Sequence, residues 1–176
     1  MPLNSRNKGA GFEREIANKL NDFFVDIGVD YKTKRNLNQY QEKDQCDLDL
    51  PFHAVECKFY KEGEWLKSAW WDQVCSASNG KIPVLIFKFN RRPIRVCIPL
   101  HAMNLDWPEE NDKICVMSMD HWLDVLKKNW RRYEKHFIGL TKMQLKELNN
   151  ILILVNYYHI LRHRRQSWID QYFIHK

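Results

Sequence analysis

The sequence predicts an α/β fold in which helices flank a mixed central sheet, followed by a C-terminal helical extension. Over roughly residues 10–100, segments with a helical apolar period alternate with segments typical of strands. One run, IPVLIFKF, is apolar almost throughout, as expected of a central strand buried on both faces. Beyond residue 119, the apolar spacing is helical.

The first part of the chain predicts one helix and then three strands. An amphipathic helix is expected over residues 10–25, where apolar side chains recur at helical spacing, at Phe12, Ile16, Leu20 and Phe23. Residues 31–36 alternate and include Tyr and Thr, which indicates a first strand. CDLDL and HAVECKF flank Pro51-Phe52, so they are expected to form a tight hairpin.

A second helix and two more strands complete the expected core. The helix is predicted over residues 64–78 and is closed by an Asn-Gly pair. Strands follow over residues 82–89 and 94–100. We therefore expect a core over residues 1–100, a connecting segment over 101–119, and a basic helical extension over 120–176.

Composition favours a globular protein with a polyanionic partner. The chain has a net charge of +6, and 44% of its residues are hydrophobic, which is enough for a folded core. Its five cysteines form no CxxC pair and no zinc-like spacing, so reduced thiols are expected. Neither a secretory signal nor a membrane-spanning run is apparent, so we expect no membrane contact and a cytoplasmic location, in a prokaryote or in the host of a virus.

The predicted hairpin brings two carboxylates together. With a two-residue turn at Pro51-Phe52, the register pairs Asp47 with Glu56 across the strands. Facing like charges are destabilising unless something compensates them, and a divalent cation is one such compensation. A different loop length would separate the two acids. The alternation in AVECKFY also allows an ordinary solvated strand face that carries Glu56 and Lys58.

A third acid comes from the first helix. At 100° per residue, Glu13 falls within the apolar arc of that helix, where an uncompensated charge is costly. Its place near the helix start is an alternative reason, because negative charge suits the helix dipole there. Glu13, Asp47, Glu56 and Lys58 are thus expected to meet at one sheet edge. The acids suit Mg²⁺, and Lys58 would position or deprotonate a water.

The motifs KGAGFERE, CDL and VECK resemble those of the archaeal Holliday-junction resolvases, within the PD-(D/E)xK nuclease superfamily, over about residues 6–100. The resemblance implies a restriction-endonuclease-like αβββαβ core and a homodimeric, metal-dependent DNA endonuclease that uses Mg²⁺, with Mn²⁺ as a substitute. It places Glu13, Asp47, Glu56 and Lys58 at the catalytic positions, the three acids being the metal ligands. The motif proline is absent before Asp47, and Asp49 is a competing acid.

Basic residues are candidates for DNA contacts. The resemblance places Arg14 and Arg35 near the scissile phosphates. A phosphate-tracking groove is predicted from these residues and other basic side chains, namely Arg6, Lys8, Lys34, Arg91 and Arg92. Each of them taken alone is equally consistent with a solvated surface charge. Gln73 in the second helix either faces the site or is an ordinary polar helix residue.

The leading hypothesis is a magnesium-dependent endonuclease that cuts Holliday junctions or other branched DNA. A general recombination, repair or DNA-degrading endonuclease acting on duplex or flap DNA is the alternative within the same class. A basic DNA-binding module without catalysis is the alternative from another class. The apolar stripes of residues 141–163 predict a helix that takes part in a homodimer, or one that packs within its own chain.

Overall fold

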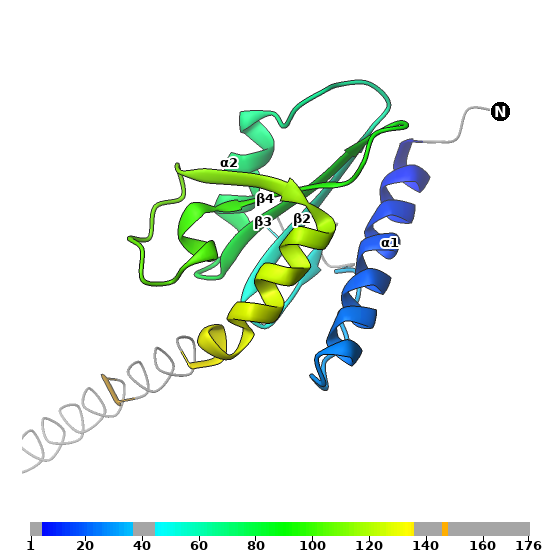
Figure 1. The fold of residues 1–176 in the computed structure, drawn as a ribbon. Helices are drawn as coiled ribbons and strands as arrows, with labels where there is room; N and C mark the ends of the chain where they lie inside the picture. Colours follow the sequence, from blue (N-terminus) through cyan, green and yellow to red (C-terminus); the bar gives the residue numbers. More distant parts are fainter. Residues whose placement is uncertain (1–4, 37–44, 136–145, 148–176) are drawn as a thin grey trace, which may run out of the picture. The chain divides into compact units, whose positions relative to one another are not determined.

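The computed structural model describes residues 5–36, 45–135 and 146–147 of the chain. The chain divides into two compact units, Met1–Tyr133 and Glu134–Lys176. All the strands described below belong to the first unit (Figure 1). The predicted dimer-forming helix over residues 141–163 lies outside the described residues, except for residues 146–147.

A five-stranded mixed sheet forms the centre of the first unit, in the order β1-β2-β3-β4-β5. Strands β2 and β3 are parallel and are connected through helix α2, Ser68–Ala77, whereas the other neighbours are antiparallel. This arrangement confirms the predicted α/β class with a mixed sheet flanked by helices. The strands are β1 Leu48–Asp49, β2 His53–Tyr60, β3 Ile82–Phe89, β4 Arg95–Pro99 and β5 Ile114–Ser118.

Helix α1, Ser5–Asp26, packs its apolar stripe on one face of the sheet. The ring of Phe12 lies 5.5 Å from that of Phe59 in β2. A helix over residues 119–135 lies beside α1, and the rings of Phe24 and Trp130 are 5.3 Å apart (Figure 1). These two helices therefore cover the face to which the odd-numbered residues of β2 point.

Helix α2 covers the opposite face, to which the even-numbered residues of β2 point. Its buried side chains form one cluster with β3 and β4, made of Trp70, Trp71, Val74, Leu85, Phe87, Phe89 and Cys97. Two residues of β2 that point to this face are polar, Glu56 and Lys58. An apolar helix face thus lies directly against the strand that carries the E-x-K pair.

The predicted first strand, residues 31–36, is reduced to an isolated bridge between Arg35 and Leu48. Side-chain hydrogen bonds take the place of a strand ladder in this segment. The amide of Thr33 donates to the side chain of Asn21, and the hydroxyl of Thr33 donates to the carbonyl of Asp49. Among the described residues, β1 and β2 therefore precede α2, and the strand predicted over residues 31–36 is absent.

The segment predicted to connect the core to the extension, residues 101–119, contributes its own structure. It includes most of the short 3-10 helix η2, Leu100–Met103, and the strand β5. Strand β5 pairs with β4 over five residues. The helix predicted from residue 120 starts at residue 119, and the structure describes it through residue 135.

All five cysteines are free thiols, as the sequence predicted. Burial raises the pKa of Cys46 to about 11 and that of Cys97 to about 12, so both stay protonated at neutral pH. In the described part of the chain, no helix combines the length and the apolar character that crossing a bilayer requires.

Candidate active site

The β1–β2 hairpin has the register that the sequence predicted. Leu48 pairs with Val55, and Asp49 pairs with Ala54. Asp47 therefore precedes β1 at the level of Glu56. The amide of Cys57 donates a hydrogen bond to Asp47 Oδ2 across 2.7 Å, which holds the carboxylate at the edge of β2.

Glu56, Lys58 and Gln73 form one hydrogen-bonded network. Lys58 Nζ donates to Glu56 Oε1 across 2.6 Å and to Gln73 Oε1 across 2.9 Å. Gln73 Nε2 donates to the same Glu56 Oε1 across 2.9 Å. Glu56 Oε2, in contrast, is buried and has no hydrogen-bond partner among the residues that the structure describes. One oxygen of Glu56 is thus fixed, while the other is left for a ligand.

Glu13 lies on α1 and is buried, as its place in the apolar arc predicted. Its Oε2 accepts a hydrogen bond from Arg35 Nε, and the two residues form an ion pair. The guanidinium that the resemblance placed near a scissile phosphate therefore contacts a carboxylate of the site. This pair compensates part of the negative charge that Glu13 brings to the sheet edge.

Burial dominates the electrostatics of the carboxylates. Burial, together with the nearby charges of Glu56 and Glu13, raises the pKa of Asp47 to about 7, although the amide of Cys57 and the charge of Lys58 act to lower it. Burial also raises the pKa of Glu56, and Lys58 acts in the opposite direction. A proton or a cation bound at Asp47 and Glu56 would therefore relieve the cost of burying these two carboxylates.

Asp49, the competing acid, lies outside this cluster. Its side chain is 59% exposed and pairs with Lys81 across 2.6 Å. Lys81 Nζ also donates to the carbonyl of Leu50. Asp49 therefore has a surface ion pair, whereas the side chain of Asp47 is buried against β2, which favours Asp47 as the site residue.

Asp47 and Glu56 fit a divalent metal ion. Within residues 5–36, 45–135 and 146–147, no three Asp, Glu, His or Cys side chains are grouped closely enough to hold an ion by themselves. The pair nevertheless offers hard oxygen donors, and Glu56 Oε2 lacks a partner within those same ranges. Mg²⁺ is commonly held by one or two carboxylates, with water and substrate phosphate completing its shell. Glu13 as a third ligand stays a prediction.

Some of the predicted DNA-contacting residues gather at the turn between β3 and β4. Lys8 Nζ, on α1, donates to Asn90 Oδ1 across 2.5 Å and lies 4.1 Å from the ring centroid of Phe59. Arg91 and Arg92 follow Asn90 directly and are exposed. Three cations, Lys8, Arg91 and Arg92, thus share one surface at this end of the sheet.

The remaining predicted DNA contacts are more scattered. Arg14 and Lys34 are exposed. The side chain of Arg6 lies outside the described residues, although its backbone belongs to α1. Arg35 is engaged with Glu13. The structure therefore supports one basic surface near Arg91 and does not assemble all seven predicted residues into one groove.

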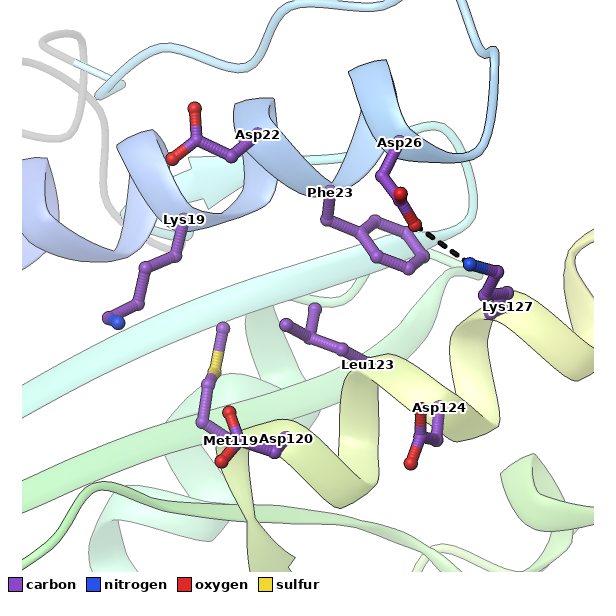
Figure 2. Close-up of a pocket in the computed structure, with 9 residues that line it drawn as sticks. All are labelled: Lys19, Asp22, Phe23, Asp26, Met119, Asp120, Leu123, Asp124 and Lys127. Carbon is purple, nitrogen blue, oxygen red and sulfur yellow. Dashed lines mark hydrogen bonds and ion pairs between the residues drawn. The ribbon is translucent and has the colours of Figure 1, made fainter.

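A cavity of about 410 Å³ lies between α1 and the 119–135 helix, away from the carboxylate pair (Figure 2). Asp26 and Lys127 form an ion pair across 2.8 Å at its rim. Four aspartates and two lysines line it, together with Phe23, Met119 and Leu123. The excess of carboxylates repels a phosphate backbone, so this cavity does not suit DNA.

Gln73 is the site residue for which the sequence left two interpretations open. Its side chain contacts both Glu56 and Lys58. The signal lies in its position on α2, because Gln73 is one helical turn after the buried Trp70 and precedes the buried Val74. A helix connecting two parallel strands packs on their sheet, so a polar residue beside its apolar stripe meets the strand motif.

The mixed sheet with flanking helices, and the Asp47, Glu56 and Lys58 cluster at its edge, define a nuclease core of the PD-(D/E)xK type. The family described as "Phage putative PDDEXK endonuclease" matches residues 4–155. The chain belongs to this family, and the protein is a nuclease. Nucleases of this superfamily generally use divalent metal ions.

Comparison with solved structures gives a partial overlay. Hjc, a Holliday junction resolvase of the archaeal hyperthermophile Archaeoglobus fulgidus, shares 17% sequence identity with this chain. The match covers 62% of this chain and 85% of that chain, with a TM-score of 0.38. No curated protein matches the chain.

Proposed function

We propose that this nuclease is a Mg²⁺-dependent endonuclease that hydrolyses phosphodiester bonds in branched DNA, the Holliday junction foremost. The observation that carries the cleavage chemistry is the state of Glu56. One carboxylate oxygen is held by Lys58 and Gln73, while the other is buried without a partner among the described residues. A purely structural carboxylate would have both oxygens satisfied.

Asp47 and Glu56 would hold the metal ion. When bound, Mg²⁺ supplies Lewis-acid stabilisation of the phosphate charge. The amide of Cys57 fixes Asp47, and Gln73 fixes Glu56, so both carboxylates are oriented before substrate arrives. Preorganised ligands avoid reorganisation during the reaction.

Lys58 acts on the water or on the phosphate. An ammonium group has three donors, and two of them go to Glu56 and Gln73. Among the described residues, this leaves one N–H without a partner, which can orient the attacking water or stabilise the charge that develops on the phosphate oxygens.

The preference for branched DNA rests on the resemblance of KGAGFERE, CDL and VECK to the junction resolvases. We propose that the protein acts as a homodimer, since a two-fold dimer places two sites for paired nicks on a symmetric junction. The proposed location is the cytoplasm, of a prokaryote or of the host of a virus. Light scattering of the full chain measures the dimer directly, and a monomer that makes paired nicks would contradict it.

The substrate experiment uses labelled four-way junction, flap, duplex and single-stranded DNA, each with Mg²⁺ and with EDTA. The expected result is Mg²⁺-dependent cleavage that is fastest on the junction. Equal rates on duplex and flap would replace the junction preference by a general repair or degradative role. Metal-independent binding without cleavage of any substrate would indicate a DNA-binding module.

Lys58→Ala is expected to slow cleavage by about 10²-fold while changing junction affinity by less than about twofold. Lys58 donates to Glu56 within the proposed metal site, whereas the phosphate contacts are assigned to the basic surface near Arg91. Single-turnover rates and binding in Ca²⁺ separate the two effects. If affinity fell as much as the rate, Lys58 would be a binding residue.

The double substitution Arg91→Ala with Arg92→Ala is expected to weaken DNA binding and to lower the salt slope by about 2, because two phosphate contacts are lost. The cleavage rate at saturating DNA should stay close to that of the wild type. Titrations over a range of salt concentrations measure the slope. An unchanged slope would show that the exposed arginines make no phosphate contact.

A further inference from the structure

A second cavity, of about 340 Å³, lies beyond the catalytic residues on the α2 face of the sheet. Its lining comes from the loop after β2, from strand β3, and from the turn and first residue of β4, and consists of Glu64, Phe87, Phe89, Arg92, Pro93 and Arg95. The proposed cleavage chemistry uses none of the residues on the floor of this cavity.

Strand register places the cavity close to the reacting groups. Lys58 pairs with Phe87 in β3, and Phe87 pairs with Arg95 in β4. Two strand spacings therefore separate Lys58 from Arg95, about 10 Å between backbones. This span corresponds to a few nucleotides of a strand that rises about 3.4 Å per nucleotide.

Aromatic rings lie beside the cavity, where those of Trp65 and Trp70 contact Phe87 of its lining. Trp65 is 55% exposed, and its ring lies 5.5 Å from the guanidinium carbon of Arg95. Tyr60, 44% exposed, stacks on Trp70 with ring centroids 4.8 Å apart. Lys67 Nζ lies 5.6 Å from both of those centroids. A single exposed tryptophan needs no explanation, but aromatic rings interleaved with cations around a cavity are the composition of a nucleic-acid site.

The loop that carries Trp65 is held tightly against the sheet. Gly63 has a φ of +138°, and a Cβ at this position would lie 2.2 Å from the Phe89 ring. The close approach depends on glycine, because it has neither a side chain nor a steric barrier to positive φ. The cavity wall is therefore a defined part of the fold.

The charge of the residues around the cavity indicates the kind of ligand that it would bind. Arg92, Arg95 and the nearby Lys67 carry positive charge, against one acid in the lining, Glu64. The arginines would bind phosphate groups, and the ring of Trp65 would stack on the flat face of a base. A carboxylate such as that of Glu64 can also accept a hydrogen bond from an exocyclic amino group of a base. A duplex hides its base faces in the stack, whereas unpaired nucleotides expose them.

We propose that this cavity binds unpaired nucleotides of the DNA strand next to the scissile phosphate, with a base stacked on Trp65 and phosphates held by Arg92 and Arg95. The inference rests on the proposed function, because it takes DNA to be the substrate. It deepens that function for branched substrates that carry unpaired nucleotides, such as flaps, because it gives the enzyme a way to distinguish them from a continuous duplex.

The test measures binding of the full chain, in EDTA, to a labelled single-stranded oligonucleotide and to the duplex of the same sequence. Trp65→Ala is expected to weaken single-strand binding by about 5- to 150-fold, the range for loss of one stacked base, and to change duplex binding less than about twofold. Trp65→Phe should restore most of the affinity. Trp107→Ala is the matched control, because Trp107 is also exposed, at 47%, but its neighbour Asp106 pairs with Arg132, which does not line the cavity.

Two results would overturn the inference. One is equal single-strand affinity of the Trp65→Ala variant and the wild type, and the other is an equal loss in the Trp107→Ala variant. Because binding is measured without divalent metal, the outcome does not depend on cleavage. Failure of all substrates to be cut would refute the proposed function alone, whereas cleavage together with an unchanged Trp65→Ala variant would refute the cavity assignment alone.

Discussion

Glu56→Gln is expected to reduce the single-turnover rate of DNA cleavage by about 10³-fold and to leave DNA affinity within about twofold of the wild type. Glutamine has the shape of glutamate and can still accept hydrogen bonds from Lys58 and Gln73 through its oxygen. The change therefore removes the negative charge of a ligand while it keeps the local structure. Removal of divalent metal should have a similar effect on the wild type.

The same substitution should not destabilise the metal-free fold. Burial raises the pKa of Glu56, which means that the folded protein disfavours its charged form. A neutral glutamine avoids this cost, so the thermal midpoint at a mildly alkaline pH without metal is expected to stay equal or to rise. Calorimetry of both proteins in EDTA measures it.

Glu15→Gln is the matched control, since Glu15 forms a surface ion pair with Lys88 across 3.7 Å. Its cleavage rate should equal that of the wild type. Metal-dependent cleavage by the Glu56→Gln variant at nearly the wild-type rate would contradict the role of Glu56 as a metal ligand. Loss of cleavage together with a lowered thermal midpoint would instead point to a structural role.

The hairpin is the part of the site that sequence predicted most completely. A two-residue turn at Pro51-Phe52 fixes the register, and a slip by one residue would turn the buried Leu48 and Val55 to the wrong face. The alternation of β2 then determines that Glu56 and Lys58 share a side. These are local rules of period and turn length, and they need no knowledge of distant contacts.

Contacts between segments that are far apart in the sequence could not be predicted from these local rules. Arg35 meets Glu13 across 22 residues, and Lys8 meets Asn90 across 82 residues. No local period encodes such distances. Likewise, the segment at residues 31–36 has strand-like alternation, yet Thr33 bonds to a helix side chain, Asn21, so tertiary contacts override the propensity.

Strand β5 was missed for a different reason. Its residues, Ile114–Ser118, are mostly half-buried and follow an acidic, proline-containing stretch typical of a loop. Pairing with β4 along one side stabilises this strand. An edge strand of this kind buries too little apolar surface to give a strong pattern, so its presence depends on the neighbour that it pairs with.

Asp47→Asn and Asp49→Asn are expected to differ by at least about 10²-fold in cleavage rate, with Asp47→Asn the impaired variant. Asp47 is buried beside Glu56, whereas Asp49 forms an ion pair with Lys81 at the surface. Loss of such a partly exposed pair costs at most about 1 kcal/mol of stability. Equal rates in the two variants would contradict the role of Asp47, and a slower Asp49→Asn variant would transfer that role to Asp49.

Asp47 is also expected to make the free energy of unfolding depend on pH, and this can be measured without cleavage. The pKa of Asp47 is about 7 in the folded state, above its ordinary value of 3.8. The folded protein thus binds this proton more tightly than the unfolded chain. The resulting stability is fully present below about pH 4 and is lost as the pH rises through about 7.

An asparagine in place of Asp47 is neutral at every pH and would not show this loss. In metal-free urea titrations, the Asp47→Asn variant should therefore gain stability relative to the wild type as the pH rises from about 4 to about 8, by about 2 to 4 kcal/mol. Mg²⁺ has to displace the same proton, so wild-type cleavage should rise with pH through about 7. A stability difference between the Asp47→Asn variant and the wild type that is constant over this range would show that Asp47 does not titrate in the folded site.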